Sequence, residues 1–414
     1  MQFKLSGAMA GLAVHGLPIS LNFTTSARIR GAFKLEDLQK ALERLREVHP
    51  LLAVRIDPGG EGGYPCFTTE GVPPIPLRVV ERRTDQDWAR EVEREIAIPT
   101  DYRTGPFFRC VWLRGEVVSD LVLVSDHVTA DGYAGIYALR DLLRMLADPG
   151  LSLEPGSPPR MIDVVPPAMQ KMVNEKILAS TATPFSQHDH GLPDFNSITP
   201  LGVIPLELDR DETAALVERC RREGTTVQAA LCAAFSVPFA ERQPAQPVRC
   251  IETPYNLRNR LLRPVDNVYG VFISLVYTRL DCTPGRDRWE IARQASQSLA
   301  NVTEEQLFSI PIIMMQVADH PLTMPVVNFD YDLSISNLGR VNIPARYGNL
   351  TLESIYAPTM NVDSPVHRIL GVTTFDGIMR CTYTSRDPRA PDLTRRSLEI
   401  LAERVHQPVK EATP

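Results

Sequence analysis

Apolar residues recur at spacings of three and four along several stretches of the chain, which is typical of helices that bury one face. Residues 35–48 carry the clearest stripe, with leucine or valine at positions 35, 38, 42, 45 and 48. The same spacing predicts helices over 133–147, 211–222, 225–240 and 392–406, and a short one over 168–178. We therefore expect amphipathic helices in both halves of the chain.

Shorter apolar runs bounded by turn residues predict strands between these helices. The expected strands cover 23–30, 53–56, 107–113, 117–127, 203–208, 247–257 and 327–341, and an Asp376-Gly377 turn joins 372–375 to 378–385 in a hairpin. No sequence repeat is visible, yet both halves mix strands and helices in a similar order. The pattern predicts a mixed α/β protein, an α+β sandwich, with two lobes of like construction.

The chain has 414 residues, which is too long for one ordinary core. Residues 151–200 are rich in Pro, Ser, Thr and His, as is typical of a connector. We predict an N-terminal lobe over 1–150, a linker over 151–200 and a C-terminal lobe over 201–414.

Composition and charge exclude several classes of function. A hydrophobic fraction of 43% and a charged fraction of 23% are those of a soluble globular protein. The net charge is −6 without a Lys/Arg run, so nucleic acids and anionic membranes are disfavoured as partners. No apolar run reaches the ~20 residues of a membrane span, and Gly and His15 interrupt the weak resemblance of the N-terminus to a signal peptide. We expect a cytoplasmic protein.

Metal and cofactor motifs are missing from the sequence. The seven cysteines are odd in number and contain no CxxC, which argues against a disulfide scaffold or a zinc site. His188 and His190 lie in the expected linker without a partner cluster. Neither a GxSxG elbow nor a Gly-rich nucleotide loop occurs. We predict neither a metal nor a cofactor.

The strongest chemical candidate is His127, in SDHVTADG (125–132), where a predicted strand gives way to a loop and a helix. A neutral imidazole, with an ordinary pKa near 6.5, can accept a proton from a hydroxyl or amine at neutral pH. Asp131 would hold the loop or orient the ring, and Gly132 would let the main chain turn into the helix. The alternative is a core histidine bonded to backbone. Asp126 should point to the opposite face of the strand, as a structural or solvent-facing residue.

SDHVTADG resembles the HHxxxDG motif of the condensation-domain and coenzyme A-dependent acyltransferase superfamily. Four other segments are similar to that superfamily, and most of all to its polyketide-associated acyltransferases: LEDLQKALERLREVHPLLAVRI (35–56), GPFFRC (105–110), EGTTVQAALCAAF (223–235) and SNLGRV (336–341). The resemblance spans residues 20 to 400. The BAHD-type DFGWG motif is absent.

The resemblance implies two chloramphenicol-acetyltransferase-like lobes that form a pseudo-dimer, with the site in a tunnel at their interface. His127 would be the general base. Asp131 would hold the loop through an arginine, for which Arg258 is the first candidate and Arg260 the second, and Gly132 would keep the loop shape. Ser336 or Asn337 would donate to the oxyanion or line the tunnel. Asp126 stands where the motif has its first histidine.

Three hypotheses follow. The leading one is transfer of an acyl group from a thioester, on coenzyme A or an acyl-carrier protein, to a hydroxyl of a polyketide or lipid-like acceptor. The second is a free-standing peptide condensation enzyme that forms an amide. The third, motivated by Asp126, is a degenerate binding or scaffold protein. Because one chain supplies both lobes of the interface, a monomer is expected.

Overall fold

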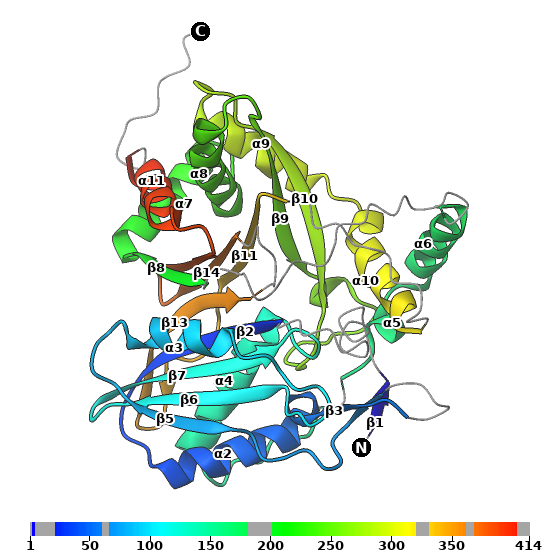
Figure 1. The fold of residues 1–414 in the computed structure, drawn as a ribbon, viewed down its shortest axis with the longest axis vertical. Helices are drawn as coiled ribbons and strands as arrows, with labels where there is room; N and C mark the ends of the chain where they lie inside the picture. Colours follow the sequence, from blue (N-terminus) through cyan, green and yellow to red (C-terminus); the bar gives the residue numbers. More distant parts are fainter. Residues whose placement is uncertain are drawn as a thin grey trace.

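The computed structural model describes residues 2–4, 21–59, 66–156, 158–180, 201–319, 331–361 and 368–403. Two lobes stand one above the other, each built on a six-stranded sheet (Figure 1). This arrangement confirms the predicted α/β class with two lobes of like construction. No helix in the described ranges is both long and apolar enough to cross a membrane.

The first lobe is a sheet with helices on both faces. Its strand order is β12-β13-β2-β7-β6-β5. The strands are β2 (Asn22–Arg30), β5 (Leu77–Glu81), β6 (Phe108–Arg114), β7 (Val118–Asp126), β12 (Arg346–Tyr347) and β13 (Leu350–Met360). The apolar stripes of α2 (Leu35–Val48) and α4 (Gly132–Ala147) pack on one face, and α3 (Asp87–Ile96) covers the other. Beside them, β1 (Gln2–Lys4), β4 (Cys66–Thr68) and β3 (Arg55–Asp57) form a small sheet, and the 3-10 turn η1 (Pro50–Ala53) follows α2.

The second lobe repeats the plan with the strand order β10-β9-β11-β14-β15-β8. These strands are β8 (Gly202–Leu208), β9 (Val248–Asn256), β10 (Ile273–Asp281), β11 (Leu333–Arg340), β14 (Arg368–Phe375) and β15 (Ile378–Ser385). A core on one face joins the sheet to α7 (Arg210–Arg222), α8 (Val227–Arg242), α9 (Arg288–Ala300) and α11 (Ala390–Glu403). A separate cluster holds α5 (Met161–Val164), α6 (Pro167–Ser180) and α10 (Glu304–Asp319), together with the leucines on either side of the 3-10 turn η4 (Arg258–Arg260).

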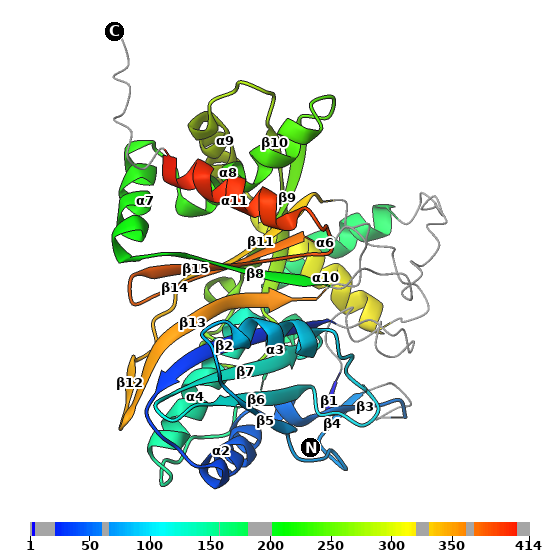
Figure 2. The same cartoon turned by 60° about the vertical axis from the view of Figure 1, so that its left-hand side comes forward.

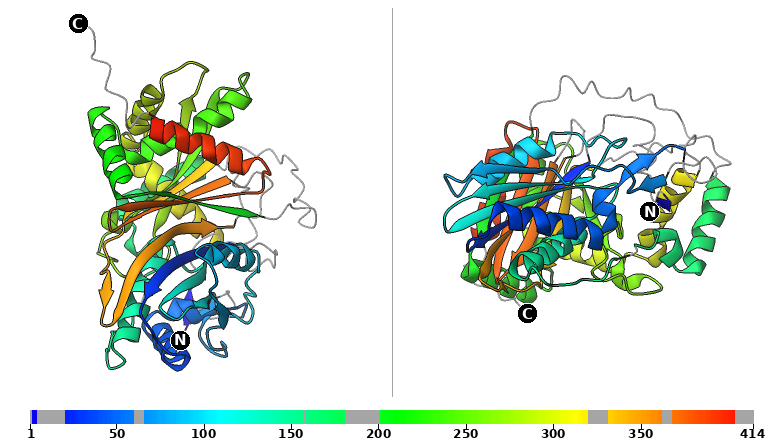
Figure 3. Two further views of the ribbon diagram at one scale, coloured as in Figure 1. Left: turned by 90° about the vertical axis from the view of Figure 1, so that its left-hand side faces the viewer. Right: turned by 90° about the horizontal axis from the view of Figure 1, so that it is seen from below.

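A crossover strand ties the lobes together. β13 comes from the second half of the chain but pairs with β2 in the first sheet, and it runs directly under β14 and β15 (Figures 2 and 3). Gly371 allows this contact, because a Cβ there would lie 1.9 Å from the Pro358 carbonyl oxygen. The Thr373 hydroxyl donates to the Ile355 carbonyl at 3.1 Å. Residues 346–360 therefore belong to the first sheet, although they lie in the range expected for the C-terminal lobe.

Local signals account for most of the predicted elements. The helix predicted over 35–48 has those bounds, Thr226 caps α8, and Asp376 and Gly377 turn the β14–β15 hairpin with positive φ angles of 49° and 79°. Among the elements not predicted are α3, α9, α10 and β13. β13 alternates only over its first four residues and is buried on both faces from 354 to 359, so most of it lacks the polar–apolar alternation that marks a strand.

Candidate active site

His127 is the first residue after β7, a central strand held between β2 and β6. Its backbone N–H donates to the Leu21 carbonyl at 3.0 Å, which fixes the point where the strand ends. Asp126 then forms the turn. Its Oδ1 accepts from the Val128 N–H at 2.9 Å, and its carbonyl accepts from the N–H groups of Thr129 and Ala130. Asp126 is fully buried, so it organises the turn from inside the protein and does not face solvent.

The His127 ring is half-buried and lies against the ring of Phe23, with 4.5 Å between centroids. Burial lowers the pKa of His127 to about 4, although the charge of Asp131 and a backbone hydrogen bond with Ala130 act in the opposite direction. The imidazole is therefore neutral at pH 7. Because the hydrogen bond raises the pKa, the backbone group of Ala130 is its carbonyl, which accepts the N–H of one ring nitrogen. The other ring nitrogen of His127 then keeps its lone pair. That state is the one a general base requires.

Asp131 is the N-cap of α4 and is completely buried. Its Oδ1 accepts from the Ala134 N–H at 2.9 Å. Its Oδ2 accepts from Arg258 Nη1 at 2.7 Å and from the Phe272 N–H at 2.8 Å. The carboxylate thus receives one hydrogen bond from its own helix and two from the second half of the chain, and it joins the motif to the other lobe.

Arg258, in η4, is the partner of Asp131 and is also buried. We call the ion pair of Asp131 and Arg258 the clamp. Its Nη2 donates to the carbonyls of Val268 and Gly270, at 3.4 and 3.3 Å. The guanidinium carbon lies 5.0–5.8 Å from three ring centroids, which is the range of cation–π contact; the rings are those of Tyr133, Tyr137 and Phe272. Arg260, the second candidate, instead contacts Glu304 and Tyr255 at the surface.

Gly132 lies where β11 of the second lobe approaches α4. A Cβ at this position would be 2.9 Å from Leu338 Cδ2. The next residue, Tyr133, donates its hydroxyl proton to the Leu338 carbonyl at 2.9 Å. Gly132 therefore has a close contact across the lobes in addition to the loop-shaping role that the sequence predicted. Tyr133, Gly270 and Phe272 belong to the same junction and carried no signal in the sequence, because their contacts are backbone hydrogen bonds and ring contacts with residues far away in the chain.

Ser336 and Asn337, the predicted oxyanion donors, are partly buried on β11. Asn337 Oδ1 accepts from the Gly339 N–H at 2.8 Å, at the point where the β11–β14 register shifts. Within the part of the chain that the structure describes, no hydrogen bond joins either side chain to His127. Their role in catalysis stays a prediction.

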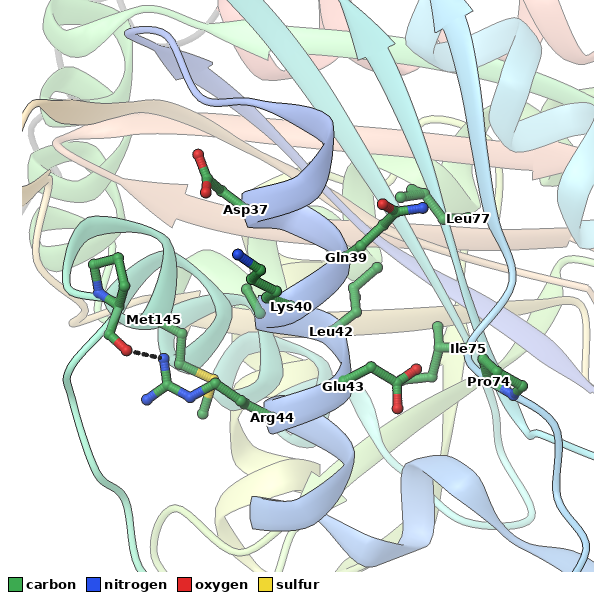
Figure 4. Close-up of a pocket in the computed structure, with 12 residues that line it drawn as sticks. Asp37, Gln39, Lys40, Leu42, Glu43, Arg44, Pro74, Ile75, Leu77 and Met145 are labelled. Atoms are coloured by element: carbon green, nitrogen blue, oxygen red, sulfur yellow. Dashed lines mark hydrogen bonds between the residues drawn. The ribbon is translucent and has the colours of Figure 1, made fainter.

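Two cavities are notable. One, of about 80 Å³, lies behind the motif loop between Thr129 of the first lobe and Gly270 and Phe272 of the second. It is smaller than the roughly 300–1,000 Å³ of typical small-molecule sites. The other, of about 580 Å³, lies beside Leu42, on α2, and Ile75, and none of its lining residues belongs to the motif (Figure 4). A substrate tunnel that passes His127 therefore stays a prediction.

The expected absence of a metal also stays a prediction, because His188 and His190 lie outside the described residues. Elsewhere, the described ranges contain no group of three or more His, Cys, Asp or Glu side chains placed to hold a metal ion.

Comparisons with known proteins show which family model and which solved structures the chain resembles. Residues 181–380 match the model of the family described as phthiocerol/phthiodiolone dimycocerosyl transferase C-terminus. No curated protein sequence matches the chain. Among solved structures, polyketide synthase associated protein 5 from Mycobacterium tuberculosis has a TM-score of 0.64 at 15% identity, covering 97% of this chain and 98% of that one.

Two further structures share the fold. TRI3 trichothecene 15-O-acetyltransferase from Fusarium sporotrichioides has a TM-score of 0.69 at 14% identity, over 97% of this chain and 94% of that one. The cyclization-docking bidomain EpoB from Sorangium cellulosum has a TM-score of 0.68 at 17% identity, over 99% and 85%. At these identities the likeness shows the two-lobe fold.

Proposed function

We propose that this chain, which has the two-lobe condensation-domain fold and matches the dimycocerosyl transferase C-terminal model over residues 181–380, is an acyltransferase. It transfers an acyl group from a thioester, on coenzyme A or an acyl-carrier protein, to a hydroxyl of a polyketide or lipid-like acceptor. The observation that carries the proposal is His127, neutral at pH 7 at the end of a central strand and next to a loop clamped between the lobes.

In the proposed reaction, the free ring nitrogen of His127 takes the proton of the acceptor hydroxyl as its oxygen attacks the thioester carbonyl. The tetrahedral intermediate then collapses, the carbon–sulfur bond breaks, and the imidazolium returns the proton to the thiolate. The products are an ester and a free thiol. The thioester supplies the driving force, so the proposal includes no cofactor.

The neighbouring residues act on this step through position and charge. Asp131 and Arg258 form an ion pair that holds the loop that carries His127. Ser336 or Asn337 is proposed to donate a hydrogen bond to the oxyanion, a contribution worth about 3 kcal/mol where it exists. One chain supplies both lobes, so the proposed working form is a monomer, which sedimentation analysis would test.

Free-thiol release from a panel of acyl-CoA thioesters, with alcohols and matched amines as acceptors, tests this function. Wild-type protein should release thiol with alcohols, and His127→Ala should lose turnover while its unfolding transition stays at the wild-type position. The shape-conserving His127→Gln should fail in the same way, because it keeps the volume of the side chain but lacks a basic nitrogen.

Each other result selects an alternative. Full activity of His127→Ala removes the catalytic assignment. A clear preference for amines over alcohols favours amide formation. Absence of thiol release from any thioester in the panel, with a folded protein, favours a binding or scaffold protein.

A further inference from the structure

A buried carboxyl lies in the middle of the second sheet, on the face opposite the helices. Glu252 on β9 is directly opposite Tyr277 on β10 and Ser334 on β11 in the strand register. The Tyr277 hydroxyl donates to Glu252 Oε2 at 3.0 Å, and the Ser334 side chain also hydrogen-bonds the carboxyl. The three side chains form one row across three strands. Glu252 is 6% exposed, whereas Tyr277 is 39% exposed and opens the row to solvent.

This carboxyl has no cationic partner among the described residues. Within the described part of the chain, two hydroxyls stabilise its ionised form, and burial raises the pKa of Glu252 to about 7. Tyr331 is close enough for the charge of Glu252 to help raise its pKa, as happens with Tyr277. A half-ionised carboxyl therefore lies among hydroxyls and two aromatic rings. Buried carboxylates in proteins are normally paired with a cation. The described residues supply no such cation to the ionised form of Glu252.

The same face of the sheet leads to the candidate active site. Ser336, the proposed oxyanion donor, is two residues beyond Ser334 on β11, which is about 7 Å along the strand. Asn256 is four residues beyond Glu252 on β9, about 13 Å, and hydrogen-bonds Tyr133 beside the motif. Along the strands, the row of Glu252 therefore lies about 7 Å from Ser336 and about 13 Å from the residue that contacts Tyr133. β9, β10 and β11 stand side by side at this edge of the sheet (Figure 1).

We propose that Glu252, Tyr277 and Ser334 form a subsite for a protonated amine on the acceptor, at a distance from the hydroxyl that reacts. The inference rests on the proposed acyl transfer and adds to it the chemical class of the acceptor. An ammonium group would donate to Glu252 and complete the ion pair, and the rings of Tyr277 and Tyr331 would add cation–π attraction. A neutral hydroxyl would be held by hydrogen bonds alone and would leave the carboxylate without a counter-charge.

Three linear acceptors of equal length test the subsite: octanol, octanediol and aminooctanol. Their binding is measured by calorimetry at pH 7, and their turnover by thiol release with one acyl-CoA. In the wild type, aminooctanol should bind and react about tenfold better than octanol. Glu252→Gln should abolish that preference by lowering the rate with aminooctanol far more than the rate with octanol, whereas a general loss of structure would lower both rates alike. Tyr277→Phe should reduce the preference in part.

Glu353→Gln is the matched control, because Glu353 is partly exposed on β13 and pairs with Arg30 on the neighbouring strand β2, away from the second sheet that holds Glu252. It should keep the wild-type preference. The subsite is refuted if octanediol is favoured as strongly as aminooctanol, or if Glu252→Gln keeps the preference for the amine. Binding of aminooctanol that depends on Glu252, without turnover of any acceptor, would support the subsite and contradict the proposed acyl transfer.

Discussion

Two buried carboxyls, Asp131 in the motif loop and Glu252 in the second sheet, differ in what balances their charge. Asp131 accepts three hydrogen bonds, one of them from the buried guanidinium of Arg258. Glu252 is nearly as buried but is held by a tyrosine and a serine hydroxyl. The same chemical group is charge-paired at the first site and without a cation, among the described residues, at the second.

We interpret the paired carboxyl of Asp131 as a structural group and the unpaired carboxyl of Glu252 as a ligand-binding group. At the paired site, removing either partner leaves a charge buried without compensation, so the pair serves to hold the loop between the lobes. At Glu252, burial of the carboxyl beside the exposed ring of Tyr277 destabilises the folded protein. No ion pair with a described residue offsets this loss of stability. A site of that kind can take its missing charge from a ligand.

The largest effect is expected when the paired carboxyl loses its cation. Arg258→Met should lower the free energy of unfolding by about 3–5 kcal/mol, because Asp131 is then buried and uncompensated. Urea unfolding followed by circular dichroism measures this. The control is Arg260→Met, which removes a surface ion pair and should cost less than about 1 kcal/mol.

Adding Asp131→Asn to the Arg258→Met variant should recover part of the lost stability, because the unpaired charge is gone. By itself, Asp131→Asn should lower stability and activity together. If both arginine variants cost the same, Asp131 and Arg258 do not form the clamp described above.

The unpaired carboxyl of Glu252 should make the free energy of unfolding depend on pH. The pKa of Glu252 is about 7 in the folded protein and lies near its ordinary value when unfolded. Its contribution to stability is therefore full at pH 4 and is lost as the pH rises through 7. Glu252→Gln should gain up to about 3 kcal/mol relative to the wild type between pH 4 and pH 8. Parallel pH–stability curves for the two proteins would contradict the buried, unpaired state.

The pH–rate profile tests whether burial outweighs the charge of Asp131 and keeps the His127 ring neutral. Burial sets the pKa of His127 at about 4, so kcat/KM should stay level from pH 8 down to pH 5. At pH 5 the neutral fraction is about thirtyfold larger than for a histidine with a pKa near 6.5. An acid limb near pH 6.5 in the pH–rate profile would show that the ring is solvated and would count against the described geometry.

The smallest effect compares two tyrosine hydroxyls. Tyr133→Phe removes a hydrogen bond to the Leu338 backbone carbonyl at the lobe junction and should cost about 1 kcal/mol in urea unfolding at any pH. Tyr277→Phe removes a donor to a titrating carboxyl, so its cost should be greater at pH 8 than at pH 4. A cost that varies with pH for Tyr133→Phe would contradict this distinction.

The sequence by itself determined the features that repeat within one element or lie within one short motif. The apolar stripe of residues 35–48, the strand that ends just before His127, and the Asp376-Gly377 turn are local, because side-chain periodicity and turn chemistry act over a few residues. The choice of Arg258 as the partner of Asp131 came from the family resemblance, since no local rule links residues so far apart in the chain.

Tertiary structure decided what depends on register and on contacts between distant segments. Glu252 looks like an ordinary polar position of a strand until the register places it between Tyr277 and Ser334. Strand β13 could not be assigned to the first sheet from sequence, because a strand buried on both faces shows neither alternation nor which sheet will pair with it. Pairing, register and desolvation depend on the whole folded chain, and these decided where the unpaired carboxyl lies.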